Sequence, residues 1–398
     1  MTPLVEALAA VRARARPLPA EDVPLTEAYG RVLAEGVRAR HDQPAADVSM
    51  MDGYALRAAD AGAPLRVVGE LAAGDPPWER ALQPREAARI FTGAPLPAGA
   101  DCVVMQEHCV READQVRVRQ PPKDGQHIRR RGEELTAGTE ALSRGRVLDS
   151  ADLALAAACG ARSVRAYRRP RVAVLCTGSE LVPLGEEPGP GQIVETNSLT
   201  LAALCRDAGA EVLRLGIAPD SVSAIADRLR DASADILLTT GGASVGEHDH
   251  AQDALERLGG ELIFHTVAIR PGKPVLFGTA SRDRLVFGVP GNPAAATLGF
   301  ELFVRLAIRL LSGDPHPDRP RAKARLRGTL SQVKGLTFFP RGRVIAQGSQ
   351  LVFAPGGQQS SMQIASWSGA NAVAVIPPGE GRVEEGSEID VLLVGALA

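Results

Sequence analysis

At 398 residues the chain is too long for one typical hydrophobic core, so we expect two to four domains. A formal net charge of -2 and an aromatic content of 4% argue against binding to nucleic acid or to an acidic membrane. The five cysteines are widely spaced and form no C-x-x-C pair, which argues against a zinc ribbon or disulfide framework and favours a reducing cytoplasm.

The chain begins with an amphipathic pattern over Met1–Arg16, which predicts a helix rather than a signal peptide. Residues 43–134 are predicted to form a β-rich insert, because short strand-like runs alternate with Gly/Pro turns. Residues 1–42 and 135–168 flank this insert and are expected to pack together as a discontinuous linker domain, giving an elongated molecule. The strands expected in the insert are Leu65–Val68, Arg89–Phe91, Cys102–Met105 and Val116–Val118.

Residues 169–316 alternate between strand and helix patterns, which predicts a doubly wound, mostly parallel α/β domain. The expected strands are Val172–Cys176, Val212–Leu215, Ile236–Leu238, Leu262–Ile269, Val275–Gly278 and Leu285–Val289. The expected helices are Leu199–Ala208 with Ser198 as its cap, Ser221–Arg230, His250–Leu258 and Ala294–Leu311.

Residues 317–398 follow a Gly/Pro linker and alternate as strands do, which predicts a small C-terminal β-barrel or sandwich. The expected strands are Ala322–Arg327, Val344–Gln347, Ala372–Ile376 and Ile389–Leu393. The fold class expected for the chain is therefore α/β plus β in several domains. Its longest apolar run, Leu153–Cys159, is far too short to span a membrane.

Three hydrophobic runs of the α/β segment each end in a glycine-rich loop, at 239–249, 270–274 and 290–293. Ligands of such sheets bind at the carboxyl ends of strands, where glycines let backbone N–H groups approach an oxyanion. The first loop is a candidate anion cradle through Thr239, Gly241, Gly242, Ser244 and Gly246, and the alternative is a plain strand-to-helix turn.

The other two loops add cations and a helix start. Arg270 and Lys273 lie in a stiff loop with two prolines, which suits oxyanion binding, whereas a solvated basic turn is the alternative. Pro290 and Pro293 stand where a helix begins, so either an anion binds there or Asn292 simply caps an ordinary helix.

Acidic residues accompany these loops, and carboxylates beside oxyanion donors imply a divalent metal. Asp249, Asp220 and Glu195 are the candidates, although Glu195 lies just before a helix and capping it is the alternative. In the insert, Asp52-Gly53 is typical of a turn. The run Arg129–Arg131 is typical of a solvated face, with a phosphate clamp as the alternative.

Taken together, these motifs resemble the molybdopterin molybdenumtransferase family, to which MoeA and the E domain of gephyrin belong. The matching stretches cover nearly the whole chain in the family's order and include SMMDGYA at 49–55, RIFTGAPLP at 89–97, IRRRGEE at 128–134, TGSEL at 177–181, GQIVETN at 191–197, TTGGASVGEHD at 239–249, AIRPGKP at 268–274 and VPGNPAA at 289–295.

The resemblance implies a reaction in which adenylylated molybdopterin receives molybdate at its dithiolene and AMP leaves in a Mg²⁺-dependent step. It assigns catalysis to Asp249, Asp220, Glu195 and Lys273, the three acids also holding Mg²⁺. Molybdate would be held by Arg270, Lys273, Arg341 and Ser361, and the pterin phosphate by Thr239–Gly246, with Pro290 and Pro293 beside them. Thr92, Asp52 and Glu134 would act from the insert.

The resemblance also implies a homodimer in which the insert of one subunit meets the α/β domain of the other. Contacts with a molybdopterin adenylyltransferase and with apo-molybdoenzymes are further expected partners. The sequence departs from the family pattern at Arg270, where Lys is usual, at Ala295, where Ser is usual, and at Glu134, where Asp is usual. The alternative functions are a molybdopterin adenylyltransferase and a non-catalytic molybdopterin carrier or scaffold.

Overall fold

The computed structural model describes residues 1–241 and 250–397. The backbone divides into two compact units. Unit 1 comprises Met1–Glu21, Gly30–Ala34 and Ala166–Ala398, and unit 2 comprises Asp22–Tyr29 and Glu35–Arg165. Within the described ranges, no helix combines the length and apolar character that crossing a membrane requires.

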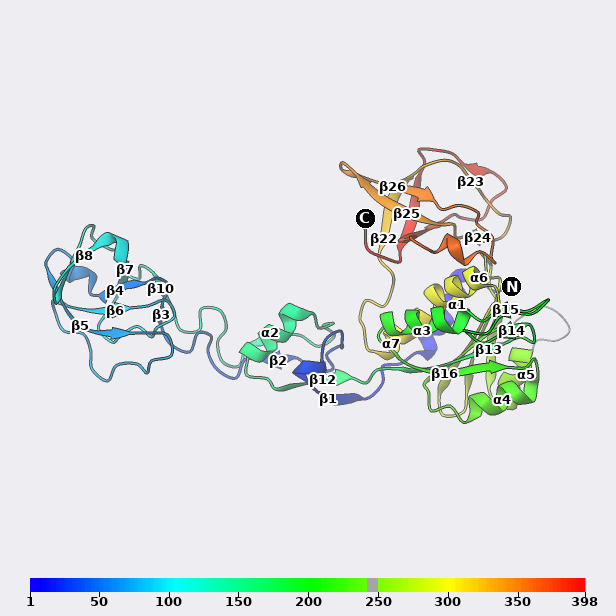
Figure 1. Ribbon diagram of the computed structural model, residues 1–398, viewed down its shortest axis with the longest axis horizontal. Coiled ribbons are helices and arrows are strands. Elements are labelled where there is room, and N and C mark those ends of the chain that lie inside the picture. The colour runs from blue at the N-terminus through cyan, green and yellow to red at the C-terminus, as the bar shows by residue number, and fades with distance from the viewer. Residues whose placement is uncertain (242–249, 398) are drawn as a thin grey trace. The chain divides into compact units, whose positions relative to one another are not determined.

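Unit 2 is built around a six-stranded sheet in the order β7-β4-β6-β5-β9-β8 (Figure 1). The four predicted strands are present, and β4 and β8 are additional. Pairing is antiparallel except between β5 and β6, which run parallel, so the predicted β-rich insert contains a mixed sheet. The strands are β4 (Gly53–Leu56), β5 (Leu65–Leu71), β6 (Glu86–Ile90), β7 (Cys102–Met105), β8 (Cys109–Glu112) and β9 (Gln115–Val118).

Asp52-Gly53 leads into strand β4 and is not an isolated turn, which corrects the sequence interpretation. A Cβ placed on Gly53 would lie 1.9 Å from the carbonyl oxygen of Val104, so the backbones of β4 and β7 approach too closely for any other residue. Glycine is therefore required here by close packing inside the sheet.

The rest of unit 2 consists of short paired strands and one helix. Helix α2 (Ser150–Ala158) begins with a capping box between Asp149 and Asp152. The division between the two units falls within β1 and β12. The short strands are β1 (Ala20–Pro24), β2 (Val37–Arg38), β3 (Val48–Ser49), β10 (Ile128–Arg129), β11 (Glu140–Leu142) and β12 (Ser163–Tyr167).

Unit 1 contains a second six-stranded sheet, in the order β16-β13-β17-β21-β20-β18. The first four strands are mutually parallel, and β20 runs antiparallel between β21 and β18. Strand β18 consequently runs in the same direction as the parallel set. The strands are β13 (Arg171–Thr177), β16 (Glu211–Ala218), β17 (Ile236–Thr240), β18 (Glu261–Thr266), β20 (Pro274–Ala280) and β21 (Arg284–Val289).

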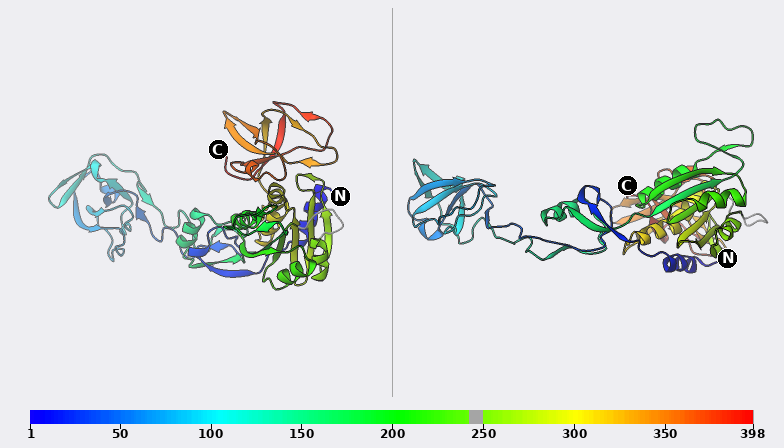
Figure 2. Two further views of the ribbon diagram at one scale, coloured as in Figure 1. Left: turned by 45° about the vertical axis from the view of Figure 1, so that its right-hand side comes forward. Right: turned by 90° about the horizontal axis from the view of Figure 1, so that it is seen from below.

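Helices cover both faces of this sheet, which confirms the doubly wound prediction (Figure 2). Helices α3, α6 and α7 share one buried apolar cluster with α1, whereas α4 and α5 share a second cluster on the opposite face. The helices are α1 (Leu4–Arg14), α3 (Asn197–Asp207), α4 (Val222–Arg230), α5 (His250–Arg257), α6 (Pro293–Gly299) and α7 (Arg305–Leu311).

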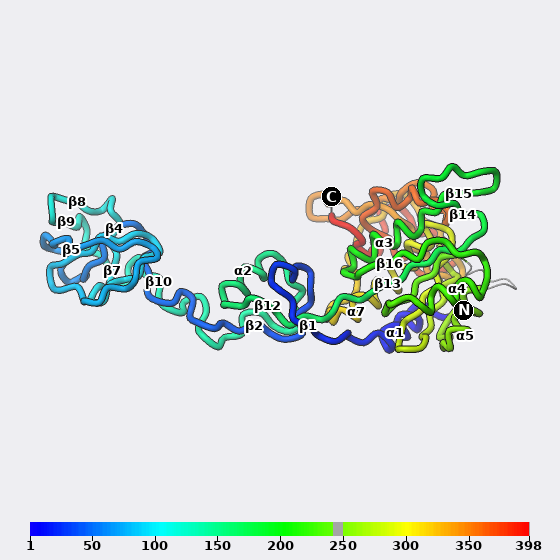
Figure 3. Tube along the Cα trace, turned by 60° about the horizontal axis from the view of Figure 1, so that its bottom comes forward, coloured from blue at the N-terminus to red at the C-terminus, as the bar shows by residue number. Residues whose placement is uncertain are grey.

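Three local predictions in this domain are wrong. Ser198 is not the cap of α3 but a buried residue inside its first turn. The single helix expected over Ala294–Leu311 is interrupted by a π-helical turn at Phe300–Val304. The strand expected over Leu262–Ile269 ends at Thr266, and the chain then forms a separate short strand, β19 (Ile269–Arg270). The tube in Figure 3 shows the loop between β14 (Leu181–Val182) and β15 (Ile193–Val194) projecting from this domain.

The C-terminal segment closes into a five-stranded barrel in the order β22-β26-β25-β27-β29, as predicted for its class. The four predicted strands are present, and β26 was not predicted. The barrel strands are β22 (Arg321–Leu326), β25 (Arg341–Gln347), β26 (Gln350–Pro355), β27 (Ala372–Val375) and β29 (Glu388–Leu393). Short β24 (Thr337–Phe338) pairs with β19 of the α/β domain, and β23 (Leu330–Ser331) pairs with β28 (Arg382–Val383).

The acid sensitivity of unit 2 follows from its hydrogen-bonded carboxylates. Backbone N–H groups are the first cause that lowers the pKa of Asp42, Asp47 and Asp52. A lowered folded-state pKa stabilises the fold above the usual carboxylate pKa, and this contribution is lost as the pH falls through the folded-state value. The urea concentration at which unit 2 is half unfolded should therefore decrease as the pH is lowered from about 5 to about 3.

Unfolding of unit 2 can be followed by tryptophan fluorescence, because each unit contains one of the two tryptophans of the chain. The variant Trp367→Phe leaves Trp78 as a fluorescent reporter of unit 2. Adding Asp47→Asn should flatten the pH dependence, since an amide does not titrate in this range. An equally steep dependence with and without Asp47 would contradict the assignment.

Candidate functional site

The described parts of the glycine-rich loops, at 239–241, 270–274 and 290–293, lie at one edge of the α/β sheet. Strands β13, β17 and β21 are adjacent and parallel, so their carboxyl ends lie together, and β18 ends at the same edge. Helix α3, which follows β13, packs on one face, whereas α5, which follows β17, packs on the other. The chain therefore diverges between β13 and β17, which is the switch point where open α/β sheets bind ligands.

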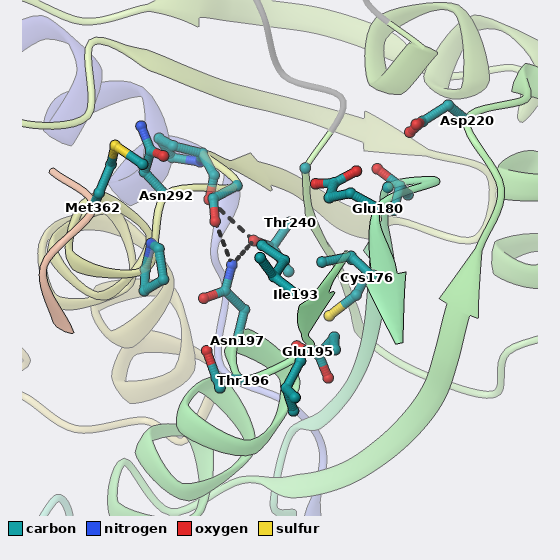
Figure 4. A pocket seen from close by; sticks show the side chains of 18 of the residues that line it. Cys176, Glu180, Ile193, Glu195, Thr196, Asn197, Asp220, Thr240, Asn292 and Met362 are labelled. Carbon is teal, nitrogen blue, oxygen red and sulfur yellow. Dashed lines mark hydrogen bonds between the residues drawn. The ribbon is translucent and has the colours of Figure 1, made fainter. Parts of the chain in front are cut away.

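A cavity of about 700 Å³ lies at this switch point, and Figure 4 shows its lining side chains. Its walls come from the ends of β13 and β17, from the start of α3 and from the loop after β21. Glu180, Glu195 and Asp220 line it, and no lysine or arginine is found among the lining residues that the structure describes. The cavity is accordingly acidic.

One amide organises this cavity. The Nδ2 of Asn197 donates to the Thr240 hydroxyl at 2.9 Å and to the Gly291 carbonyl at 2.7 Å, and Thr240 donates onward to the Pro290 carbonyl at 3.0 Å (Figure 4). These bonds join α3, β17 and the loop after β21. Thr239, predicted to bind an anion, instead directs its hydroxyl to the Phe287 carbonyl at 3.4 Å.

The predicted need for glycine at Gly241 has a specific cause. Its φ is +92°, and a Cβ there would lie 2.1 Å from the carbonyl oxygen of Thr177. Gly291 in turn lies close to the backbone of Gly241, since a Cβ on Gly291 would lie 3.4 Å from the Cα of Gly241. The ends of β13, β17 and β21 are thus brought together by glycines. Gly242, Ser244, Gly246 and Asp249 lie outside the described residues.

The predicted acids are used in different ways. Glu195 is buried, and its two oxygens accept from the backbone N–H and the hydroxyl of Ser198, so it caps α3 as the alternative interpretation held. Asp220 is exposed and accepts from the backbone N–H and hydroxyl of Ser179 at 3.1 and 3.3 Å. Within the described residues no group of three side chains is arranged to hold a metal.

Glu180 is a further acid that the sequence interpretation did not single out as a metal ligand. It lies on the same side of the cavity as Asp220, away from Asn292 and Met362 (Figure 4). The signal was its place in TGSEL, directly after β13, where a side chain enters the switch point.

A second cavity of about 530 Å³ adjoins the first and has the opposite charge. Arg270 and Lys273 line it, and no carboxylate is found among its described lining residues. The guanidinium of Arg270 lies 5.4 Å from the centre of the Phe338 ring, which orients it by a cation–π contact. The two cavities share Pro274, Pro290 and Asn292 as a common wall.

The barrel supplies the other wall of this cationic cavity through Gln359, Ser360 and Ser361. The Ser361 carbonyl accepts from the N–H groups of Ala294 and Ala295 at 3.0 and 3.3 Å. The Asn292 side chain donates to the Ser361 hydroxyl at 3.2 Å instead of capping its own helix. A barrel loop therefore occupies the first N–H groups of α6, beside Pro290 and Pro293.

Arg341, predicted to hold molybdate, is fully buried and is not among the residues that line the cavity. Its Nη2 donates to the Ser360 carbonyl at 3.0 Å, and its backbone exchanges two hydrogen bonds with the side chain of Gln359. Its Nη1 lacks a partner among the described residues, and burial lowers its pKa to about 10. Arg341 thus stabilises the barrel loop at Gln359 and Ser360 from inside the barrel domain.

The predicted insert residues lie in unit 2. Asp52 accepts from the backbone N–H and hydroxyl of Thr92 at 2.8 and 2.9 Å, so these two form one exposed pair. Glu134 pairs with Arg129. Arg130 and Arg131 pair with Asp47 and Asp42, so the arginine run is engaged by carboxylates and a phosphate clamp is not favoured.

Comparison with known proteins identifies the family. Three family models match: MoeA N-terminal region (domain I and II) over residues 2–160, probable molybdopterin binding domain over 173–310, and MoeA C-terminal region (domain IV) over 323–394. The molybdopterin molybdenumtransferase of Nostoc sp. is 39% identical and aligned over 94% of this chain and 88% of its own length. Molybdopterin molybdenumtransferase 2 of Mycobacterium tuberculosis is 40% identical, with 93% and 94% covered.

A solved structure agrees with these sequence matches. The molybdopterin biosynthesis moea protein from Pyrococcus horikosii has a TM-score of 0.84 and 30% identity, with 100% of both chains covered. The chain therefore belongs to the molybdopterin molybdenumtransferase (MoeA) family, as its motifs predicted.

The close approach at Gly241 gives a testable expectation. Gly241→Ala should lower the free energy of unfolding by roughly 2–4 kcal/mol, because it combines a positive φ with a backbone clash. Gly259→Ala is the matched control, since its φ is +67° but nothing lies within 4 Å of the added Cβ. It should cost only about 1 kcal/mol. Urea unfolding of both variants measures the two losses of unfolding free energy, and equal losses would refute the packing argument.

Proposed function

We propose that this chain inserts molybdate into the dithiolene of adenylylated molybdopterin and releases AMP, forming molybdenum cofactor. The observation that carries the proposal is the pair of adjoining cavities with opposite charge at the switch point. The cationic cavity suits an oxyanion, and the acidic cavity suits a phosphoryl group that is bound to a metal ion. The names of the relatives, which are molybdopterin molybdenumtransferases, support it.

In this proposal the cationic cavity receives molybdate. Arg270 and Lys273 supply charge-assisted donors, and the hydroxyl of Ser361 adds a neutral one. Arg341 contributes by holding the loop that presents Ser360 and Ser361. Because Ala295 offers no hydroxyl at this wall, recognition depends more on the two cations.

The acidic cavity receives the adenylate end of the substrate together with Mg²⁺. The described lining fits a hard divalent cation, since it offers carboxylates and no competing lysine or arginine. Asp220 and Glu180 are the exposed carboxylates that would hold it, with Asp249 as the third predicted ligand, while Glu195 positions α3. Bound Mg²⁺ would neutralise negative charge on the phosphoryl oxygens.

The proposal extends to assembly and location. A homodimer would bring Asp52, Thr92 and Glu134 of one insert to the cavities of the other subunit. A cytoplasmic location and transient contacts with a molybdopterin adenylyltransferase and apo-molybdoenzymes follow from the same reaction, which receives one cofactor intermediate and passes on the next.

The direct test combines purified protein, adenylylated molybdopterin, Mg²⁺ and molybdate. AMP release together with activation of an apo-molybdoenzyme supports the proposal. Binding of the pterin with no AMP release points to a carrier, and ATP-dependent transfer of AMP to molybdopterin points to an adenylyltransferase.

Removal of a cation should weaken the oxyanion step. Lys273→Ala is expected to raise the molybdate concentration for half-maximal AMP release by about 10- to 100-fold, the equivalent of one charge-assisted hydrogen bond. Lys323→Ala removes an exposed lysine that pairs with Asp390 on the barrel and serves as the control. Similar molybdate dependence in the two variants would argue against an oxyanion at Lys273.

Removal of an acid should change the metal requirement instead. Asp220→Asn is expected to raise the Mg²⁺ concentration for half-maximal AMP release by at least about tenfold, with little change in the molybdate dependence. Asp227→Asn, on the exposed side of α4 and paired with Arg230, is the control. A shift in the molybdate dependence alone would place Asp220 outside the metal site.

A further inference from the structure

Three buried threonines stand at the carboxyl edge of the α/β sheet, and one of them differs from the others. Thr239 and Thr240 both donate to backbone carbonyl groups. Thr177, the last residue of β13, is 3% exposed, and its hydroxyl has no hydrogen-bond partner among the described residues. A buried hydroxyl without a partner destabilises a fold, which makes its presence at a ligand cavity informative.

The residue that carries this hydroxyl lies at the wall of the acidic cavity. Thr177 lines that cavity. A Cβ at position 241 would come within 2.9 Å of its Oγ1, so glycine at this position keeps a neighbouring side chain off the hydroxyl. A polar atom that has no partner among the described residues therefore belongs to a residue of the cavity wall, at the end of β13 and beside the switch point.

The charge of the cavity limits the kind of ligand group to which this hydroxyl can donate. Among the described lining residues there are carboxylates and one histidine, His250, but no lysine or arginine, so an anionic ligand relies on a bound cation and on hydrogen-bond donors that carry no permanent charge. The Thr240 hydroxyl is already committed to Pro290 and Asn197. Thr177 offers a neutral O–H donor that no described residue engages.

We propose that the Thr177 hydroxyl donates a hydrogen bond to a phosphate oxygen of the substrate. This inference rests on the proposed function, because it places the phosphate-bearing substrate in the acidic cavity. Thr177 thereby acts as a substrate-binding residue whose polar atom is reserved for the ligand. The absence of a partner for it among the described residues lowers stability in exchange for recognition.

Thr177→Val tests this directly, because valine keeps the shape and removes the hydroxyl. The thermal midpoint of the ligand-free protein should stay the same or rise, since no bond is lost. Affinity for the phosphate ligand should fall about tenfold, the loss of one hydrogen bond to a charged group. Thr177→Ser, which keeps the hydroxyl, should restore most of the affinity.

Thr240→Val is the matched control for stability. Its hydroxyl has two partners, so its removal should lower the thermal midpoint by roughly 2–4 °C. If Thr177→Val lowers the midpoint as much as Thr240→Val does, the Thr177 hydroxyl has a structural role and the inference is wrong.

Binding is measured by calorimetry in Mg²⁺ with two probes, molybdopterin and AMP, which carry the two candidate phosphates. Weakening for molybdopterin assigns Thr177 to the pterin phosphate, weakening for AMP assigns it to the adenylate, and either result supports the inference. Unchanged affinity for both probes in Thr177→Val overturns it. If the wild-type protein binds neither probe, the proposed function fails together with the inference.

Discussion

The candidate site depends on the side-chain amide of Asn197. Its two hydrogen bonds connect the start of α3 to the end of β17 and to the loop after β21. Those three segments line the acidic cavity, so the two bonds hold its walls at a fixed separation together with the bond from Thr240 to Pro290. Glu195 caps the same helix from the preceding turn, which holds Asn197 at the position where both bonds form.

Opposite charges lie close together in this domain without neutralising each other, and the chain topology explains why. The acids follow β13 and β16, whereas Arg270 and Lys273 lie in the connection between β18 and β20 on the other side of β17. Pro274 and Pro290 stand between the two cavities. Proline fixes φ and has no N–H donor, so these two residues stiffen the wall and add no backbone donor to either cavity.

Much of the fold could be predicted, because buried parallel strands are continuous apolar runs that end in glycine. Strand β4 was missed since Asp52-Gly53 has the composition of a turn, and only the nearby Val104 carbonyl explains the glycine. The motifs located the site loops, but not how their atoms are used. Whether Glu195 caps or ligates, and whether Thr177 has a partner, depends on neighbours distant in sequence. The four predicted domain boundaries and the catalytic roles stay predictions.

The barrel loop at Ser361 has a consequence for how such a site arises. The Ser361 carbonyl accepts from the N–H groups of Ala294 and Ala295 at the start of α6. Ser361 and the residues beside it form one wall of the cationic cavity. An isolated α/β domain would lack this wall, and its Ala294 and Ala295 N–H groups would lose the Ser361 carbonyl as acceptor. The second cavity therefore belongs to two domains at once, and a change in the barrel loop alters its shape without any substitution within the sheet.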